Sequence, residues 1–292
     1  MKITGKSKVF GIIGWPVSHS LSPVFHNAAF DYLGLDCCYV PLPVEVGRLD
    51  VAIKAISALN IAGLNVTVPH KEGVIPYLSE LSKEAMMIGA VNTIKVSGER
   101  LLGYNTDGIG FITSLHEAGQ SVSGRSILIL GAGGAARAVV FAAANGSAEK
   151  IIIANRTAGK AESLKEQVQE HFPSVKVEAT GMGYDDLREV SNKVDMIINT
   201  TSLGLKQGDP SPVPREFLHR DLFVCDLIYN PPETELVRYA KDLCRGYMNG
   251  LGMLLHQGAA SFKLWTDIKP PVHIMRQALQ DALQQRPSSG RM

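Results

Sequence analysis

The chain has 292 residues, of which 45% are hydrophobic and 20% are charged, so it can bury a full core and form two medium-sized domains. Its formal net charge of +1 provides no basic field that would favour nucleic acid or a membrane surface as a partner. The N-terminus lacks the apolar run of a secretory signal, and no apolar stretch approaches the roughly 20 residues that span a bilayer. We therefore expect a cytoplasmic protein whose partner is a small molecule, with no nucleic acid and no membrane involved.

The cysteines and histidines show no metal-binding pattern. Cys37 and Cys38 are adjacent while Cys225 and Cys244 stand alone, which gives neither a CxxC pair nor a disulfide framework. The histidines include no HExxH sequence and no His/Cys spacing suited to zinc. The sequence therefore predicts reduced, buried thiols and no metal.

Strand and helix patterns alternate along the first part of the chain, which is typical of a parallel sheet with helices on its faces. The strand candidates and the helical patterns that separate them are, in chain order, residues 9–13, 25–33, 37–40, 49–59 and 63–68. Ser97-Gly98-Glu99 then predicts the turn of a short hairpin.

A change of composition follows at residues 118–125, which are rich in Gly, Ser and Gln and have no apolar period. This stretch predicts a domain boundary. A second alternating series begins at Ser126. Its predicted strands are residues 127–130, 150–154, 194–199 and 223–228, and a last helix is predicted over 272–285, after Pro270-Pro271.

The first chemical signal is a glycine-rich turn between a strand and a helix, Gly131-Ala-Gly-Gly-Ala135-Ala136-Arg137. This is the dinucleotide-binding fingerprint in its expected context. Gly131 permits the tight turn, Gly133 lets backbone N–H groups approach a pyrophosphate, and Ala136 lets the helix pack close to the strand. Because methyltransferases and flavoproteins use related turns, the turn alone does not identify the cofactor.

The end of the next strand favours NADP. An NAD enzyme would carry Asp or Glu about 20 residues after the turn, to hold the ribose 2′-hydroxyl. This chain has Asn155-Arg156-Thr157 instead. The guanidinium of Arg156 can pair with a 2′-phosphate, which a carboxylate would repel. The alternative is that Arg156 only lies at the exposed start of a helix.

Reducing a carbonyl also requires a proton donor, and the Tyr-x-x-x-Lys pair of short-chain dehydrogenases is absent. Polar residues instead cluster where apolar stretches end. These clusters are Ser18 to Pro23, Asn65 to Lys71, Ala90 to Thr93 and Asn105 to Gly108. Each can also serve as an ordinary cap or turn; Ser22 before Pro23 has the pattern of an N-cap followed by proline at the first helical position.

From about residue 10 to residue 262 the chain resembles the shikimate dehydrogenase family. The matching segments, in order, are Ser20-Leu-Ser22-Pro23, Asn65-Val-Thr67-Val-Pro-His-Lys71, Gly89-Ala-Val-Asn92-Thr, Asn105-Thr-Asp107-Gly, Gly131-Ala-Gly-Gly-Ala135, Asn155-Arg156-Thr157, Asn199-Thr-Thr-Ser202, Asp226-Leu-Ile-Tyr229, Gly250-Leu-Gly252-Met253 and Gln257. The chain departs from the family pattern at Asn249, where an acid often precedes the glycine, and at His256.

The resemblance implies a reversible, NADPH-dependent reduction of 3-dehydroshikimate to shikimate in the chorismate and aromatic amino acid pathway. Lys71 and Asp107 would be the catalytic acid/base pair, with the ammonium donating the proton in the reducing direction. The implied substrate residues are Ser20, Ser22, Thr67, Asn92, Asp107, Tyr229 and Gln257. The implied NADP residues are Gly131, Ala132, Gly133, Gly134, Ala135, Asn155, Arg156, Thr157, Thr200, Ser202, Leu227, Gly250 and Met253.

The architecture expected from this resemblance is α/β. An N-terminal α/β substrate-binding and catalytic domain would span residues 1–118 and be completed by C-terminal helices at 252–286. A Rossmann-type doubly wound parallel-sheet domain for NADP would span residues 119–251, with the active site in the interdomain cleft. The sequence leaves open whether the protein is a monomer or a homodimer.

Two other functions remain open at this point. A quinate/shikimate dehydrogenase with broader specificity would share the fold, although Arg156 and the absence of an acid after the second strand argue against broad cofactor use. A non-catalytic NADP-binding regulatory protein would keep the glycine turn but have little use for both Lys71 and Asp107.

Overall fold

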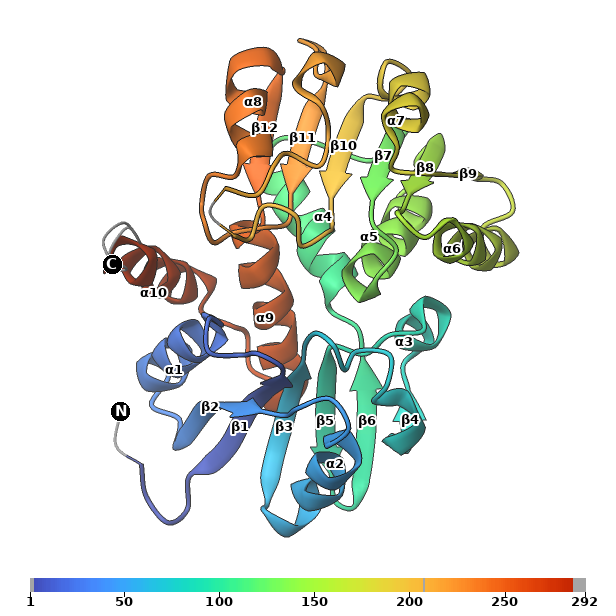
Figure 1. Cartoon of the computed structure of the whole chain (residues 1–292). Coiled ribbons are helices and arrows are strands. Elements are labelled where there is room, and N and C mark those ends of the chain that lie inside the picture. Colours follow the sequence, from blue (N-terminus) through green and yellow to red (C-terminus); the bar gives the residue numbers. More distant parts are fainter. Residues whose placement is uncertain (1–2, 207, 286–292) are drawn as a thin grey trace. The chain divides into compact units, whose positions relative to one another are not determined.

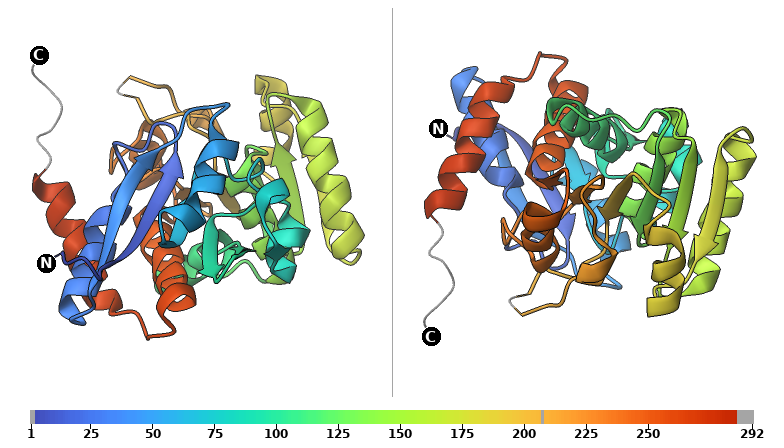
Figure 2. Two further views of the ribbon diagram at one scale, coloured as in Figure 1. Left: turned by 90° about the horizontal axis from the view of Figure 1, so that it is seen from below. Right: turned by 90° about the horizontal axis from the view of Figure 1, so that it is seen from above.

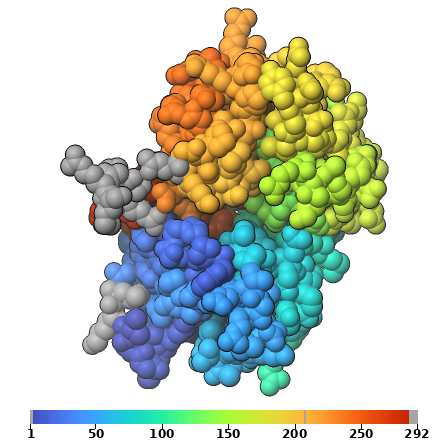
Figure 3. All heavy atoms as spheres, viewed as in Figure 1, coloured from blue at the N-terminus to red at the C-terminus, as the bar shows by residue number. Residues whose placement is uncertain are grey.

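The computed structural model describes residues 3–206 and 208–285 (Figure 1). Among these residues the contacts define two compact units: unit 1 comprises residues 3–106 and 254–285, and unit 2 comprises residues 107–206 and 208–253. In Figure 3 the residues coloured blue to cyan gather in one body and those coloured yellow to orange in another. The α/β fold class is confirmed. The boundaries predicted at 118/119 and 251/252 stay predictions of where the functional domains divide, and Arg286, inside the predicted 252–286 segment, lies outside the described residues.

Unit 1 contains a six-stranded mixed sheet in the order β2-β1-β3-β5-β6-β4. The strands are β1 (Lys8–Gly14), β2 (Cys37–Pro43), β3 (Ile61–Val66), β4 (Glu80–Leu81), β5 (Thr93–Ser97) and β6 (Arg100–Tyr104). Strand β1 pairs in parallel with β2 and β3, and β5 pairs antiparallel with β3 and β6. The three strands and the hairpin turn predicted from the sequence of this half are therefore confirmed, although β3 begins and ends two residues before the predicted 63–68. The predicted parallel sheet is mixed, because the hairpin of β5 and β6 adds antiparallel pairs.

The helices of unit 1 come from both ends of the chain. They are α1 (Ser22–Tyr32), α2 (Leu49–Ala58), α3 (Lys83–Ile88), α9 (Leu251–Thr266, in unit 1 from Leu254) and α10 (Val272–Gln285), with a short 3₁₀ helix at Ile75–Tyr77. Helices α1 and α10 lie side by side although they are far apart in the sequence (Figure 2). Helix α1 has Leu21 as its N-cap and Ser22 as its first residue, so the predicted N-cap role of Ser22 is wrong by one position.

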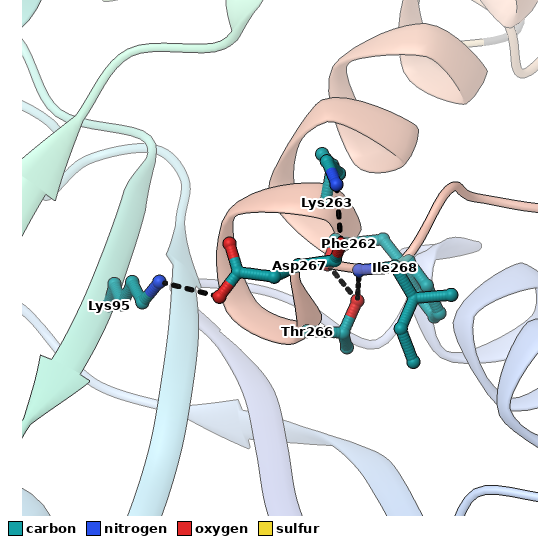
Figure 4. A network of polar contacts seen from close by, with 6 residues as sticks. All are labelled: Lys95, Phe262, Lys263, Thr266, Asp267 and Ile268. Carbon is teal, nitrogen blue, oxygen red and sulfur yellow. Dashed lines mark hydrogen bonds and ion pairs between the residues drawn. The ribbon is translucent and has the colours of Figure 1, made fainter.

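The C-terminal end of α9 is fixed to strand β5. The indole Nε1 of Trp265 donates to the carbonyl of Ile94 at 2.9 Å, and the ammonium of Lys95 lies 3.5 Å from the carboxylate of Asp267. Figure 4 shows the second contact together with the bond from Lys263 to the backbone carbonyl of Asp267. These bonds hold a helix from the end of the chain on the sheet built by its beginning.

Unit 2 contains a wholly parallel sheet in the order β12-β11-β10-β7-β8-β9, which is the doubly wound arrangement. The strands are β7 (Ser126–Leu130), β8 (Lys150–Ala154), β9 (Lys176–Thr180), β10 (Met196–Asn199), β11 (Phe223–Asp226) and β12 (Gly246–Asn249). The strand order reverses between β7 and β10, where such sheets bind their ligands. The four strands predicted in this half are confirmed.

The helices of unit 2 cover its sheet. They are α4 (Asp107–Glu117), α5 (Gly134–Asn145), α6 (Ala158–His171), α7 (Tyr184–Ser191) and α8 (Glu235–Leu243), with a 3₁₀ helix at Arg215–Phe217. Leu187 of α7 and Leu236 of α8 pack in one core cluster with Leu128 and Ile152 of the sheet. Helices α4, α5 and α6 contact one another in series.

The four cysteines, the helix lengths and the grouping of metal-ligand side chains can each be compared with the sequence predictions. Cys37, Cys38 and Cys225 are buried, Cys244 is half-buried, and all four are free thiols. Burial raises the pKa of the Cys244 thiol to about 11. In the described ranges no helix combines the length and the apolarity that a membrane crossing requires. Within those same ranges no three His, Cys, Asp or Glu side chains are grouped as metal ligands.

His26 on α1 is a titratable residue buried in the core of unit 1. It is fully buried, and neither ring nitrogen has a hydrogen-bond partner among the described residues. Its ring stacks on Tyr39 at 4.5 Å between centroids and lies 5.3 Å from the ring of Trp265. Burial lowers the pKa of His26 from its ordinary value of 6.5 to about 3. The folded protein therefore keeps this imidazole neutral.

We predict that His26 makes unit 1 sensitive to acid. The unfolded chain binds a proton at His26 below about pH 6.5 while the folded chain does not until about pH 3, so stability is complete above 6.5 and falls as pH decreases. The contribution of this one group is about 1.4 kcal/mol per pH unit. His26→Phe should remove that slope from urea unfolding curves measured between pH 7 and pH 4.5. His273→Gln, at an exposed position on α10, should keep it. Equal slopes in wild type and His26→Phe would contradict the assignment.

Candidate active site

One edge of the unit 1 sheet gathers the polar residues predicted to hold the substrate. Strand β3 ends at Val66 and β5 begins at Thr93 in the antiparallel direction, so the residues that follow β3 and precede β5 meet at the same edge. The backbone N–H of Val66 donates to the carbonyl of Asn92 at 2.8 Å. The N–H of Thr67 donates to the carbonyl of Ile13 at 2.9 Å, which brings the end of β1 to the same place.

The side chain of Asn92 is the centre of a buried hydrogen-bond network. Its Nδ2 donates to Thr106 Oγ1 at 2.8 Å and to Gln257 Oε1 at 3.3 Å. Its Oδ1 accepts the backbone N–H of Thr106 at 2.8 Å. The network therefore joins two predicted substrate residues, Asn92 and Gln257, that are 165 positions apart.

Further hydroxyl and amide groups extend this network towards α1. Asn65 Nδ2 donates to Ser261 Oγ at 3.0 Å, and Ser261 Oγ lies 2.8 Å from Thr93 Oγ1. The phenol of Tyr39 donates to Asn65 Oδ1 at 2.7 Å. Burial raises the pKa of Tyr39 well above its ordinary value, and a hydrogen bond with Ser22 opposes that rise. Ser22 is thus linked to Asn92 through buried groups of fixed geometry.

Ser20 and Lys71 complete the predicted set in unit 1. The N–H of Ser22 donates to Ser20 Oγ at 3.2 Å, and Ser20 is half-buried. The carbonyl of Lys71 accepts the N–H of Val91 at 2.8 Å, which places the backbone of this half-buried lysine beside the residue that precedes Asn92. Unit 1 therefore brings Lys71, Thr67, Asn92 and Gln257 together at one sheet edge.

The other two predicted substrate residues belong to unit 2. Asp107 is the first residue of α4, is only 4% exposed, and directly follows Thr106 in the chain. Tyr229 is half-buried in the segment after β11.

In unit 2 the predicted cofactor residues lie along the carboxyl edge of the sheet. The strand register sets the last residues of five strands side by side: Ala154, Leu130, Asn199, Asp226 and Asn249. The residues that follow them are Asn155, Gly131, Thr200, Leu227 and Gly250. All five were predicted from separate sequence segments, and the parallel register brings them into one row.

Two of these positions require glycine. Gly131 has a φ of +112°, and a Cβ there would lie 2.6 Å from Thr200 Oγ1. A Cβ on Gly250 would lie 1.9 Å from the carbonyl oxygen of Leu227. The turn after β7 therefore packs closely against the Thr200 side chain in the turn after β10, and the turn after β12 packs closely against the backbone of Leu227 in the turn after β11.

The segment after β8 presents Arg156 to solvent. Asn155 Nδ2 donates to the carbonyl of Thr157 at 2.9 Å and closes the turn in which Arg156 lies exposed. Thr157 is the N-cap of α6. Of the other predicted contacts, Ala132 and Gly133 lie in the turn after β7, and Gly134 and Ala135 begin α5. Ser202, after β10, is exposed, and Met253, in the first turn of α9, is buried.

Sequence reasoning assigned no role to several residues that hold these sites in place. Thr93, Thr106 and Ser261 support Asn92, and the side chains of Asn199 and Asp226 support the row in unit 2. One signal was present in the sequence, because Gln257 and Ser261 are four residues apart and share a helix face.

Three family models match successive parts of the chain. The shikimate dehydrogenase substrate binding domain matches residues 12–94, shikimate / quinate 5-dehydrogenase matches 114–207, and the shikimate 5′-dehydrogenase C-terminal domain matches 250–280. The NADP(+) shikimate dehydrogenase of Methanocaldococcus jannaschii is 45% identical over 286 residues, covering 96% of this chain and 99% of that protein. That of Methanopyrus kandleri is 42% identical over 286 residues, covering 97% and 98%.

Solved structures give the same result. A shikimate dehydrogenase in complex with NADP+ matches with a TM-score of 0.89 and 44% identity, over 97% of this chain and 98% of that one. The Thermus thermophilus enzyme in complex with NADP(H) and shikimate matches with a TM-score of 0.85 and 35% identity, over 94% and 100%. The chain described here therefore belongs to the shikimate dehydrogenase family of NADP-dependent oxidoreductases, which act on a CH–OH group.

Proposed function

We propose that this chain catalyses the reversible, NADPH-dependent reduction of 3-dehydroshikimate to shikimate, a step of aromatic amino acid biosynthesis through chorismate. The observation that carries the proposal is the pairing of two half-sites in one chain of this family. Unit 1 offers a buried polar cluster around Asn92, and unit 2 offers a row of backbone and small side chains at its carboxyl sheet edge.

The cofactor half-site would bind NADP through the glycine turn and Arg156. Gly133 caps α5 without a side-chain hydrogen bond, and the first backbone N–H groups of a helix have no partner within the helix, so this N-terminus suits a pyrophosphate. A Cβ at Gly133 would meet nothing within 4 Å, so the space beside this turn is open to a ligand. Arg156, exposed after β8, would pair with the 2′-phosphate, and the bound NADPH would supply the hydride.

The remaining cofactor contacts would come from the other turns along the same sheet edge. From those turns they are Asn155, Thr157, Thr200, Ser202, Leu227 and Gly250; Ala132 and Ala135 belong to the glycine turn and the start of α5, and Met253 lies in the first turn of α9. Their support is the register of the strands that precede most of them.

The substrate half-site would bind through neutral donors. The hydroxyls of Ser20 and Ser22 suit a carboxylate, and each hydrogen bond to a charged group contributes about 1.5–3 kcal/mol. The amides of Asn92 and Gln257, with Thr67 and Tyr229, suit ring hydroxyls. Hydrogen bonds with Thr106 fix the orientation of the Asn92 side chain. Asn92 can therefore discriminate the positions of those hydroxyls.

Lys71 and Asp107 would move the proton. In the reducing direction the lysine ammonium donates a proton to the oxygen that becomes the hydroxyl and stabilises the negative charge that develops there. The buried carboxylate of Asp107 would orient this ammonium and hold a substrate hydroxyl. The proposal requires that the Lys71 ammonium and the nicotinamide ring both reach one carbonyl group of the substrate, the ammonium at its oxygen and the ring at its carbon.

No observation favours the alternatives over this function. A quinate dehydrogenase from Corynebacterium glutamicum in complex with NAD matches the chain at 28% identity, below the shikimate dehydrogenases described above. Arg156 stands where an NAD enzyme would carry an acid. A cytoplasmic location and a monomeric or homodimeric state remain predictions.

The activity assay follows NADPH absorbance with 3-dehydroshikimate as substrate. We expect rapid NADPH oxidation, little oxidation of NADH, and oxidation of shikimate but not of quinate in the reverse direction with NADP+. NADP binding without turnover of either acid would instead identify a non-catalytic NADP-binding protein.

Lys71→Ala should lower kcat far more than it raises the KM for 3-dehydroshikimate. General acid catalysis contributes typically 10²–10⁴-fold, so we expect a loss of about that size in kcat. Lys54→Ala on α2, where the side chain is 75% exposed, is the matched control and should leave both parameters unchanged. A kcat unchanged by Lys71→Ala would exclude Lys71 from the chemistry.

Arg156→Ala should discriminate between the two nicotinamide cofactors. Loss of charge-assisted bonds to the 2′-phosphate should raise the KM for NADPH about 10- to 100-fold and leave that for NADH nearly unchanged. Arg188→Ala, at an exposed position of α7, controls for the loss of a surface charge. Steady-state kinetics with both cofactors measure the difference, and equal losses with both would refute the role of Arg156.

A further inference from the structure

The turns that follow β10 and β11 are joined by two buried side chains. Asn199 and Asp226 are the last residues of these strands and lie opposite each other in the parallel register. Both are 0% exposed. Asn199 Nδ2 donates to Asp226 Oδ1 at 3.0 Å. This is the last residue pair of the two strands. The two turns beyond it are joined by the hydrogen bond between these side chains.

Asn199 organises the turn after β10. Its Oδ1 accepts the backbone N–H of Thr201 at 3.0 Å and the hydroxyl of Thr201 at 2.7 Å. Its Nδ2 also donates to the carbonyl of Leu203 at 3.3 Å. Four bonds to one amide side chain therefore define the path of the backbone through Thr200 and Thr201.

Asp226 organises the turn after β11. Its Oδ1 accepts the N–H of Ile228 at 3.1 Å, and its Oδ2 accepts the hydroxyl of Thr234 at 2.6 Å. Thr234 is the N-cap of α8 and accepts the N–H of Val237 at 3.2 Å. Burial raises the pKa of Asp226, whereas the bonds from Thr234, Ile228 and Asn199 lower it.

The residues held by this network are those proposed to contact the cofactor. Thr200 directly follows Asn199, and Leu227 directly follows Asp226. The N–H of Leu227 donates to the carbonyl of Asn199 at 2.9 Å, and Thr200 Oγ1 donates to the carbonyl of Leu130, beside the glycine turn, at 2.6 Å. A shift of either turn would therefore move the surface on which NADP is proposed to lie.

We propose that Asn199, Asp226 and Thr234 are positioning residues for the NADP half-site. All three are buried, and they act by fixing the turns that carry Thr200, Ser202 and Leu227. This inference rests on the proposed function, because it takes those three residues as cofactor contacts. Loss of one bond in the network should weaken NADPH binding while the site for 3-dehydroshikimate in unit 1 stays intact.

The test compares two substitutions at Thr234. Thr234→Val removes the hydroxyl that bonds Asp226 and keeps the shape of the side chain, whereas Thr234→Ser keeps the hydroxyl. The NADPH dissociation constant is measured by fluorescence titration, which requires no turnover, and kcat and the KM for 3-dehydroshikimate are measured at saturating NADPH. We expect Thr234→Val to weaken NADPH binding about tenfold and Thr234→Ser to bind within about threefold of wild type. The KM for 3-dehydroshikimate should be unchanged in both.

A second pair keeps the test decisive if Thr234→Val does not fold. Thr201 is half-buried, and Thr201→Val removes its hydroxyl bond to Asn199 while Thr201→Ser retains it. The same split between NADPH affinity and substrate KM is expected. The positioning role is overturned by a folded valine variant that binds NADPH as tightly as its serine counterpart. It is also overturned by one that raises the KM for 3-dehydroshikimate by as large a factor as the NADPH dissociation constant. Failure of the wild-type protein to bind NADPH would instead overturn the proposed function.

Discussion

The hydrogen bonds of the Asn92 side chain are the constraint on which the proposed substrate half-site depends. One amide group joins the segment before β5, the residue before Asp107 and a helix from the far end of the chain. A buried amide that lost these partners would cost free energy, so the three segments are held together or the network fails as a whole. The anchoring of α9 by Trp265 and Asp267 secures the same arrangement from the other end of that helix.

In unit 2, distant segments are brought together by backbone geometry. A parallel sheet sets the carboxyl ends of its strands in one row, and the turns that leave that row supply N–H groups and small side chains. Gly131 and Gly250 allow the turns to pack closely, and the Asn199–Asp226 pair holds two of them. The cofactor half-site is therefore defined by strand register, whereas the substrate half-site is defined by side-chain bonds between distant segments.

The contrast between local segments and contacts between distant segments explains how much could be predicted from the sequence. The inner strand Lys150–Ala154 is an apolar run and was predicted with its observed bounds, and the other predicted strands of unit 2 agree within two residues. The edge strands Lys176–Thr180 and Gly246–Asn249 are short and more polar and were missed. The glycine turn and Arg156 could be predicted as cofactor contacts because the chemistry of each lies in one local segment. The support of Asn92 by Ser261 was not, since it joins residues whose proximity depends on the folded chain.

The central proposal is that Lys71 gives a proton to the oxygen, and NADPH a hydride to the carbon, of one carbonyl group of the substrate. A crystal structure of the chain with NADP+ and shikimate both bound tests it most directly. The account predicts the amine of Lys71 within hydrogen-bond distance of the reacting hydroxyl, with the nicotinamide on the opposite side of the carbon that bears it. An amine directed away from that hydroxyl, with another side chain in its place, would contradict the account.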